Sequence, residues 1–241
     1  MKVLVILPTY NEEENIKEIL EAIIELGDDF YPLVVDDNSK DNTAKKAEKI
    51  ADICPRIKII KRKKERSFSK SLLRGIHYGV KNRYDYLFQM DADFSHNPKK
   101  LPILLNVAKK NDFVIGSRYI KKGKIIGWER KRRWLSYLGN LFSWVFLDHR
   151  IHDWTSGFVC WRRKAIQRVN LLNHKYPKGY SFQIILKFKA LKEGLTFEEL
   201  PIVFRERIKG KTKMNNAIVK EAFWVVLNTK WQYLNKKLFK K

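Results

Sequence analysis

Carboxylate side chains stand at or shortly after the ends of three short apolar runs of this chain. Asp36 and Asp37 follow one run directly, Asp91 and Asp93 follow another, and Glu12 comes shortly after a third. In a chain with an excess of basic residues, carboxylates that gather at one place need a cation or hydrogen-bond donors to offset their repulsion. A hard divalent ion, Mg²⁺ or Mn²⁺, suits such oxygen ligands when substrate phosphates supply the rest of its coordination.

The spacing of Asp91 and Asp93 predicts metal binding most directly. A bend at the end of a strand can bring two carboxylates that are separated by one residue to the same place. We therefore predict that both bind the Mg²⁺ or Mn²⁺ ion. The alternative is that they only cap turns and the helix expected to begin at Pro98, for which Asn97 is a suitable N-cap.

The elements that must position these carboxylates alternate along the first half of the chain. Continuous apolar runs predict buried parallel strands, and segments with helical periodicity lie between them. The expected strands are 2–7, 32–35, 57–60, 84–90 and 113–115, and the expected helices are 13–26, 43–53, 67–80 and 98–110. This repetition predicts a doubly wound α/β core, which binds ligands at the carboxyl ends of its strands.

The second half departs from that repetition. A basic loop over 121–133 precedes an uncharged aromatic segment over 134–147, and a further group of strands and helices is expected over 153–207. No linker rich in Gly and Ser separates the halves. We expect one domain over 1–213 and an amphipathic basic helix over 214–241, which either belongs to that domain or lies on a membrane.

The charge, the cysteine count and the longest uncharged segment limit the kinds of function that this chain can have. The 241 residues include 50 Lys and Arg against 26 Asp and Glu, a net charge of +24 that favours polyanionic ligands or an anionic surface. Cys54 and Cys160 are too few for a disulfide framework and lack the spacing of a metal site. The uncharged segment over 134–147 is shorter than the ~20 apolar residues of a bilayer span, so we expect no transmembrane helix.

Two segments predict contact with a membrane surface. Helical spacing places five apolar side chains on one face directly after the basic loop: Trp134, Leu138, Leu141, Trp144 and Val145. The segment over 214–241 combines aromatic residues with lysines in the same way. Both resemble interfacial helices, although core packing is the alternative for either one. We therefore expect peripheral attachment to an anionic membrane surface, on its cytoplasmic face.

The order of motifs resembles the inverting glycosyltransferases of family 2 with the GT-A fold, specifically the polyprenyl (dolichyl) phosphate mannosyltransferase group. The matching segments are 8–15, 35–39, 91–93, 116–119, 127–128, Arg132 with Ser136 and Asn140, 155–158, 179–183, and 204–207 with Gly210 and Lys213. The resemblance implies a mostly parallel sheet flanked by helices, with amphipathic interface helices and with 1–213 as the catalytic domain. No Gly-x-Gly-x-x-Gly follows the first run, which argues against a dinucleotide cradle of the dehydrogenase type.

The resemblance also implies a role for individual residues. The nucleotide sugar would be bound by Pro8, Tyr10, Glu12, Val35, Asp37, Asp91, Ala92, Asp93, Arg207 and Lys213. The acceptor phosphate would be bound by Arg118, Arg132 and Ser136, since guanidinium groups match phosphate oxygens. Asp91, Asp93 and Arg118 would be the catalytic groups, and Asp153 a secondary site residue. Ser95 occupies the position at which the family has a further metal ligand, so the Ser95 hydroxyl or a water molecule would complete the coordination of the ion.

The implied reaction transfers a hexose, mannose from GDP-mannose, to a polyprenyl or dolichyl monophosphate with inversion. A phosphate monoester has a second pKa of about 6 and is already a nucleophile at neutral pH, so no general base is strictly required. The enzyme must instead hold two anionic substrates in line. The alternatives are glucosyl transfer from UDP-glucose and a non-catalytic nucleic-acid-binding domain. The acidic cluster argues against the second, so we expect no nucleic-acid partner.

Overall fold

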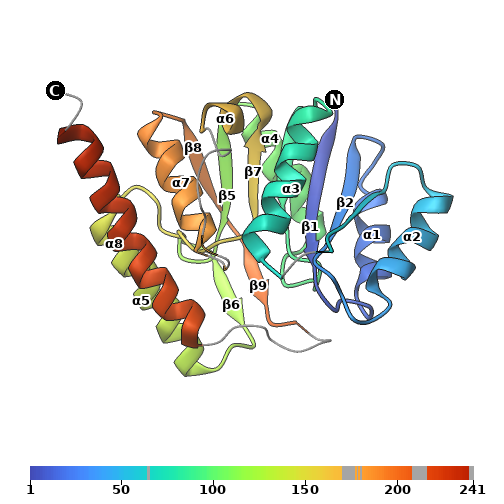
Figure 1. The fold of residues 1–241 in the computed structure, drawn as a ribbon, viewed down its shortest axis with the longest axis horizontal. Coiled ribbons are helices and arrows are strands. Elements are labelled where there is room, and N and C mark those ends of the chain that lie inside the picture. Colours follow the sequence, from blue (N-terminus) through green and yellow to red (C-terminus); the bar gives the residue numbers. More distant parts are fainter. Residues whose placement is uncertain (64–65, 170–176, 178, 180, 208–215, 239–241) are drawn as a thin grey trace.

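A central sheet with helices on both faces forms the body of the protein in the computed structural model (Figure 1). The structure describes residues 1–63, 66–169, 177, 179, 181–207 and 216–238. The elements of the first half are β1 (Val3–Thr9), α1 (Ile16–Ile24), β2 (Phe30–Asp36), α2 (Thr43–Ile53), β3 (Lys58–Lys61), α3 (Phe68–Lys81), β4 (Tyr86–Gln89), the 3-10 turn η1 (Pro98–Lys100), α4 (Leu101–Ala108) and β5 (Phe113–Ser117). The alternation predicted from the sequence is confirmed, and Asn97 caps η1 through the Lys99 N–H, with Pro98 at its first position.

The second half adds the elements that close the structure around the carboxyl ends of the strands. They are β6 (Lys124–Ile126), α5 (Arg130–Phe146), β7 (Val159–Arg162), α6 (Arg163–Arg168), α7 (Phe182–Lys192), β8 (Phe197–Pro201), β9 (Val203–Arg205) and α8 (Asn216–Leu238). The expected loop over 121–133 is wrong in detail, since it contains β6 and the first turn of α5. β6 forms by pairing with β9, about 80 residues later, which no local pattern reveals.

The main sheet has the order β3-β2-β1-β4-β7-β5-β8, and β6 with β9 forms a second small sheet. All described pairings are parallel except those of β7, which runs antiparallel between β4 and β5. The sheet is therefore mostly parallel, as expected. Its register places Pro8 beside Val35 and Thr9 beside Asp36, so the segments after β1 and β2 leave the sheet at the same edge.

Two apolar layers hold the sheet, one on each face. Leu4, Ile6 and Leu87 pack on the side of α3 and α7, whereas Val3, Val5 and Leu7 pack on the side of α1 and α4. This two-sided burial explains why the central runs are continuously apolar. The prediction of a buried strand over 57–60 is wrong in this respect: β3 lies at the sheet edge with one neighbouring strand, and its end residues are exposed lysines.

The turns at the carboxyl edge adopt uncommon backbone conformations. Asn11 after β1, Asn38 after β2 and Phe94 after β4 all have positive φ angles, of 52°, 64° and 60°. Asn enters this left-handed region readily, whereas a large aromatic residue does so at a cost in conformational energy. The chain therefore bends sharply at three neighbouring strand ends, and the bend at Phe94 directly follows Asp91 and Asp93.

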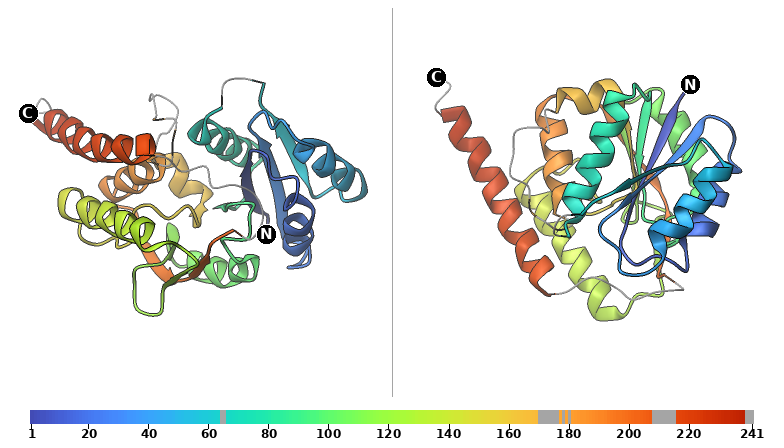
Figure 2. Two further views of the ribbon diagram at one scale, coloured as in Figure 1. Left: turned by 90° about the horizontal axis from the view of Figure 1, so that it is seen from below. Right: turned by 45° about the vertical axis from the view of Figure 1, so that its right-hand side comes forward.

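Helices α5 and α8 lie side by side at one end of the sheet (Figures 1 and 2). The Phe142 and Phe223 rings pack with their centroids 4.7 Å apart, and Val226 of α8 is buried in the apolar layer. Other apolar side chains of the pair are exposed, Trp134 by 64% and Trp224 by 74%. Among the described residues, none of the helices combines the length and apolar character needed to cross a membrane.

Candidate functional site

A cavity of about 170 Å³ lies at the carboxyl edge of the sheet, beneath α5 and α8. One part of its wall is charged and carries Asp91, Asp93, Arg118, Arg132, Glu206 and Arg207. Another part is apolar and is built by Phe68, Leu135, Phe142, Ile184, Phe223 and Val226. The cavity thus joins a group of acids, a group of arginines and an apolar surface.

Asp93 lies at the acidic end and is only 5% exposed. Its Oδ1 accepts hydrogen bonds from the Ser95 hydroxyl at 2.5 Å and the Ser95 N–H at 3.1 Å, and its Oδ2 lies 2.6 Å from Nη2 of Arg207. Burial alone would raise the pKa of Asp93, but Arg207 and the Ser95 hydrogen bonds outweigh it and hold that pKa below its usual value. Asp93 is therefore charged at neutral pH.

Asp91 has a carboxylate that is about one-third exposed, and its backbone N–H donates to Nδ1 of His96 at 3.2 Å. His96 is buried and stacks on Phe158 with ring centroids 4.9 Å apart. Burial lowers the pKa of His96 to about 4, so the ring is neutral and its Nδ1 is the acceptor. His96 thus orders the turn that carries the two aspartates without adding charge to it.

Arg207, just beyond β9, connects that turn to the segment after β1. Its Nη1 lies 3.3 Å from Oε1 of Glu12, while its Nη2 contacts Asp93. Glu12 is fixed in turn, because its N–H donates to the Thr43 hydroxyl at 2.8 Å and its Oε2 accepts from the Asn15 amide at 2.9 Å. Glu12, Asp93 and Arg207 therefore meet although they are far apart in the chain.

The residues expected to bind the nucleoside lie at the ends of β1 and β2. Asp37 pairs with the Arg62 guanidinium and accepts a hydrogen bond from the Ser67 N–H at 2.7 Å. The guanidinium carbon of Arg66 lies 4.3 Å from the centre of the Tyr10 ring. Ala92 and Val35 are buried, whereas Pro8 and Tyr10 are half-buried. Lys213 lies outside the described residues.

Arg118 lines the cavity and forms a buried, two-pronged ion pair with Asp153, which lies behind it and is not part of the lining. Nε of Arg118 donates to Oδ2 of Asp153 at 2.8 Å, and its Nη2 donates to Oδ1 at 2.7 Å and to the Thr155 hydroxyl at 2.7 Å. Burial would raise the pKa of Asp153, but Arg118 outweighs it and lowers that pKa. Within the described part of the chain Nη1 of Arg118 makes no hydrogen bond, and Arg118 lines the cavity.

Arg132 and Ser136 lie one turn apart on α5 and face the same cavity. Nη1 of Arg132 donates to Oε1 of Glu206 at 2.7 Å, and its guanidinium carbon lies 4.2 Å from the centre of the Trp128 ring. The Tyr119 hydroxyl donates to Oγ of Ser136 at 2.8 Å. Arg118 and Arg132, predicted together from motifs that are separate in sequence, thus line one cavity.

Sequence reasoning missed two groups that help to build this site. Glu206 is the acidic partner of Arg132, and Lys187 is a fully buried lysine beneath the loop that carries Asp153. For Glu206 the signal was its place inside the 204–207 motif. For Lys187 the apolar periodicity of α7 gave no sign that a charged residue occupies a core position.

The carboxylates at the acidic end are oxygen donors of the type that Mg²⁺ and Mn²⁺ prefer, and Asp91 and Asp93 are the two that line the cavity together. Among the described residues no group of three or more His, Cys, Asp or Glu could hold a metal. A divalent ion held by Asp91 and Asp93 would have only two protein carboxylates, so substrate phosphates and water would have to complete its coordination. The Ser95 hydroxyl already donates to Asp93, so it supports that carboxylate from behind.

A sequence model of the glycosyl transferase family 2 matches residues 4–170, most of the sheet and the acidic turn. The chain belongs to glycosyl transferase family 2. It is 36% identical over 231 residues to the undecaprenyl-phosphate mannosyltransferase of Micrococcus luteus, covering 96% of this chain and 94% of that protein. It is also 36% identical over 227 residues to the polyprenol monophosphomannose synthase of Mycolicibacterium smegmatis, covering 93% and 85%.

A solved structure supports the same fold for this family 2 member. The glucosyl-3-phosphoglycerate synthase of Mycobacterium tuberculosis, in complex with Mn²⁺, UDP and phosphoglyceric acid, superimposes with a TM-score of 0.71 at 16% identity. The match covers 95% of this chain and 78% of that one. The expectation of an α/β GT-A fold, a mostly parallel sheet flanked by helices, is confirmed.

Proposed function

We propose that this glycosyltransferase moves mannose from GDP-mannose to a polyprenyl monophosphate, with inversion and with a divalent metal. The observation that carries the proposal is the single cavity in which the aspartates, the arginines and an apolar wall meet. These three surfaces match three parts of the substrates: the diphosphate of the donor, the phosphate monoester of the acceptor and its lipid chain. The names of the relatives from Micrococcus luteus and Mycolicibacterium smegmatis support the same acceptor class and sugar.

The donor occupies the acidic side in this proposal. Pro8, Tyr10, Glu12, Val35 and Asp37 hold the nucleoside, Ala92 and the two aspartates lie at the diphosphate, and Arg207 and Lys213 close over the phosphates. Arg207 now neutralises Asp93, so it is placed to pair with diphosphate oxygens when the nucleotide arrives. Asp91 and Asp93 would hold Mg²⁺ or Mn²⁺, which would stabilise the charge that develops on the leaving diphosphate.

The acceptor occupies the basic side. Arg118, Arg132 and Ser136 bind the lipid phosphate, Asp153 orients Arg118, and the first units of the polyprenyl chain contact the apolar wall between α5 and α8. One phosphate oxygen forms a bond to the anomeric carbon while the bond from that carbon to the nucleoside diphosphate oxygen breaks. The diphosphate leaves with the electron pair, so no proton transfer is needed.

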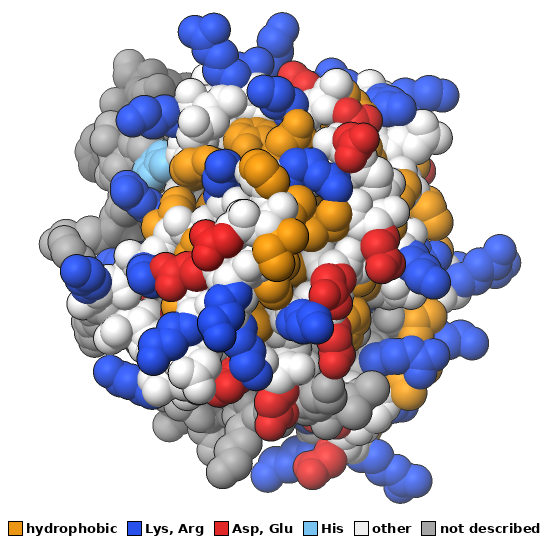
Figure 3. Space-filling view, turned by 90° about the vertical axis from the view of Figure 1, so that its right-hand side faces the viewer, with side chains coloured by type: hydrophobic (Ala, Val, Ile, Leu, Met, Phe, Trp, Pro, Cys, Tyr) orange, Lys and Arg blue, Asp and Glu red, His pale blue; other side chains and the backbone are white. Residues whose placement is uncertain are grey.

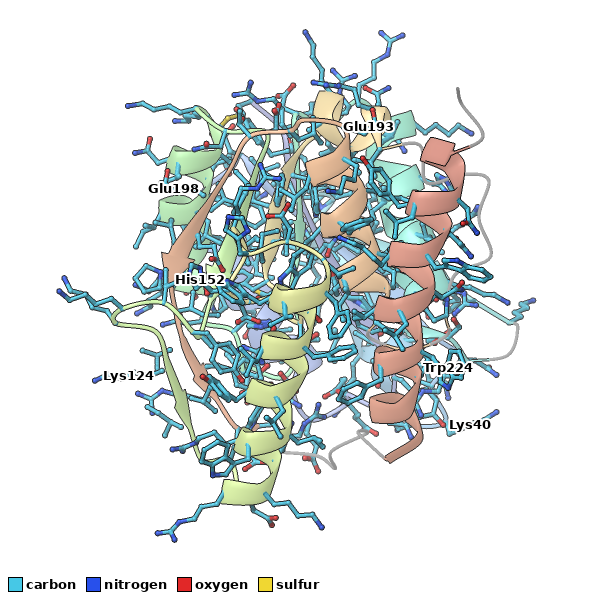
Figure 4. All side chains as sticks on the ribbon, turned by 90° about the vertical axis from the view of Figure 1, so that its left-hand side faces the viewer. Lys40, Lys124, His152, Glu193, Glu198 and Trp224 are labelled. Atoms are coloured by element: carbon cyan, nitrogen blue, oxygen red, sulfur yellow. The ribbon has the colours of Figure 1, made fainter. Side chains whose placement is uncertain are left out.

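The exposed apolar faces of α5 and α8 suit peripheral attachment to the cytoplasmic face of an anionic membrane. Trp224, labelled in Figure 4, lies on α8, and Trp231, two turns further along the same helix, is 64% exposed. Aromatic and basic side chains on neighbouring helices are typical of segments that lie in the headgroup region. Such a position would let the acceptor chain enter the cavity without leaving the bilayer.

A panel of labelled nucleotide sugars tests the proposal. The protein is incubated with GDP-mannose, UDP-glucose and UDP-galactose, with Mn²⁺ and polyprenyl phosphate in vesicles, and label is counted in the lipid extract. We expect label from GDP-mannose only, and only when the lipid phosphate is present. Transfer from UDP-glucose alone would show that UDP-glucose, and not GDP-mannose, is the donor. If no donor gives a lipid-linked product, the acceptor is not a polyprenyl phosphate.

A further inference from the structure

A fully buried lysine lies beneath the loop over 153–156, at the base of the basic side of the cavity. Lys187 of α7 is 0% exposed, and its Nζ donates to the carbonyl oxygens of Trp154 at 2.8 Å and Ser156 at 2.7 Å. Lys187 does not line the cavity. Its ammonium group therefore acts on the loop and not on a substrate.

The two carbonyls that Lys187 holds flank Thr155, which links the loop to the basic wall. The Thr155 hydroxyl accepts from Nη2 of Arg118 at 2.7 Å and from the Asn140 amide at 3.1 Å, and its N–H donates to Oδ1 of Asn140 at 3.1 Å. Asp153 at the start of the same loop accepts three further hydrogen bonds from Arg118, two from its guanidinium and one from its backbone N–H. The direction of the Arg118 guanidinium therefore depends on where this loop lies.

A buried ammonium is costly, and an apolar side chain of similar length would fill the same space. Two carboxylates lie near enough to offset the charge: Asp153, and Glu199 of β8, which accepts from the N–H groups of His152 and Asp153 at 2.9 and 3.0 Å. The positive charge of Arg118, in contrast, disfavours a positive charge on Lys187. Removing the lysine would leave two buried carbonyls without this donor and an acidic excess around the loop.

We propose that Lys187 is a positioning residue that fixes the loop over 153–156, so that Asp153 and Thr155 aim Arg118 at the acceptor phosphate. The inference rests on the proposed function, in which Arg118 binds that phosphate. It assigns a purpose to the charged residue that lies among the buried residues of α7. It also predicts that a change at Lys187 affects the acceptor more than the nucleotide, because within the described part of the chain the hydrogen bonds of Lys187 go to the loop over 153–156.

The test compares Lys187→Met with Lys192→Met, an exposed control on the same helix. We expect Lys187→Met to lower kcat/KM for polyprenyl phosphate by about 10-fold to 100-fold, the range for leaving buried carbonyls without their hydrogen-bond donor. Affinity for GDP with Mn²⁺, measured by calorimetry, should stay within about 2-fold. Lys187→Gln, which keeps an N–H donor, should recover part of the loss and replaces Lys187→Met if that variant does not fold.

A double-mutant cycle with Thr155→Val shows whether Lys187 acts through the loop. We expect the double variant to lose little more than the worse single variant, because both changes release Arg118. Full additivity, equal losses in GDP affinity and acceptor kcat/KM, or unchanged acceptor kinetics in a folded Lys187→Met variant would each overturn the inference.

Arg118→Lys distinguishes a failure of this inference from a failure of the proposed function. If Arg118→Lys lowers acceptor kcat/KM and Lys187→Met does not, only the positioning role is wrong. If Arg118→Lys leaves acceptor kinetics unchanged, the assignment of Arg118 to the acceptor phosphate is wrong, and the inference falls with it.

Discussion

At the scale of residues, two arginines of the cavity form ion pairs with carboxylates. An anionic substrate that binds these arginines would have to displace the carboxylates. Arg207 bridges Glu12 and Asp93, and Arg132 pairs with Glu206. A metal-bound diphosphate would take over the first pairing, and an acceptor phosphate the second. If these arginines bind substrate phosphates as proposed, the carboxylates already restrict their orientation, which limits the cost of orienting them when substrate binds.

Asp93→Asn keeps the size of the side chain and removes its charge. We expect turnover to fall by at least ~100-fold, because a carboxylate that supports the leaving diphosphate is lost. Addition of EDTA to the unmodified enzyme should abolish activity as well. The control is Asp28→Asn at a fully exposed position. Full activity of the Asp93 variant, or of the chelated enzyme, would contradict the metal assignment.

Arg132→Ala and Arg207→Ala should have different effects. The Arg132 variant should raise the KM for the acceptor with GDP affinity near that of the unmodified protein, whereas the Arg207 variant should weaken GDP binding. Arg133→Ala is the matched control, since its side chain is exposed on the same helix and donates to the Ile125 carbonyl. Calorimetry with GDP and steady-state kinetics with polyprenyl phosphate separate the two; equal losses in both variants would refute the partition.

At the scale of elements, local sequence patterns predicted individual helices and strands. The site depends also on how distant segments pair and pack, which those patterns do not predict. The strands over 2–7 and 113–115 are visible as apolar runs because both of their faces are buried. The pairing of β6 with β9 and the antiparallel insertion of β7 depend on contacts between distant segments, which periodicity does not encode. The cavity wall from α5 and α8 follows from such contacts as well.

The sequence predicted which residues line the site better than it predicted which side chains hold those residues in place. Asp91, Asp93, Arg118 and Arg132 all line the cavity, as their place in motifs suggested. That Arg118 is held by Asp153 and Thr155, and that Lys187 supports their loop, follows only from the folded chain. A lysine on the buried face of α7 looks in sequence like any solvent-exposed lysine.

Helix α7 should make stability depend on pH through Lys187. Burial lowers the pKa of Lys187 to about 7 from the value near 10.5 that we expect in the unfolded chain. Of the nearby charges, Asp153 and Glu199 raise this pKa and Arg118 lowers it. Between these values the unfolded chain binds more protons, so the free energy of unfolding rises with pH, by at most ~1.4 kcal/mol per unit. Denaturant titrations from pH 6.5 to 9.5 should show this slope and its loss in Lys187→Met; identical slopes would refute it.

Helices α5 and α8 should attach the protein to membranes. Trp224→Ala with Trp231→Ala should weaken binding to vesicles that contain anionic lipid, without removing it, because Trp134 and the basic end of α5 remain. Co-sedimentation at low and high salt measures the effect, and high salt should reduce binding of both proteins. Ile53→Ala, which removes an 85% exposed apolar side chain of α2, is the control. Equal sedimentation of the tryptophan variant and the unmodified protein would contradict the assignment.

At the scale of the whole molecule, a net charge of +24 coexists with an acidic end to the cavity. Figure 3 shows Lys and Arg spread over one face of the molecule with Asp and Glu between them, and not gathered into a single basic groove. Among its described residues, this face therefore offers no continuous basic groove of the kind that a nucleic-acid-binding domain would use. The general positive field instead suits an enzyme whose substrates are both anionic and whose acceptor resides in an anionic surface.

The anomeric configuration of the mannosyl phosphate product tests the central claim most directly. If the lipid phosphate held by Arg118 and Arg132 attacks the sugar while the metal-bound diphosphate leaves, one displacement occurs and the configuration must invert. The product made from GDP-mannose and polyprenyl phosphate is therefore analysed by NMR through its one-bond carbon–hydrogen coupling at the anomeric carbon. We predict a β-linked product from the α-linked donor. An α-linked product would contradict direct attack within this cavity.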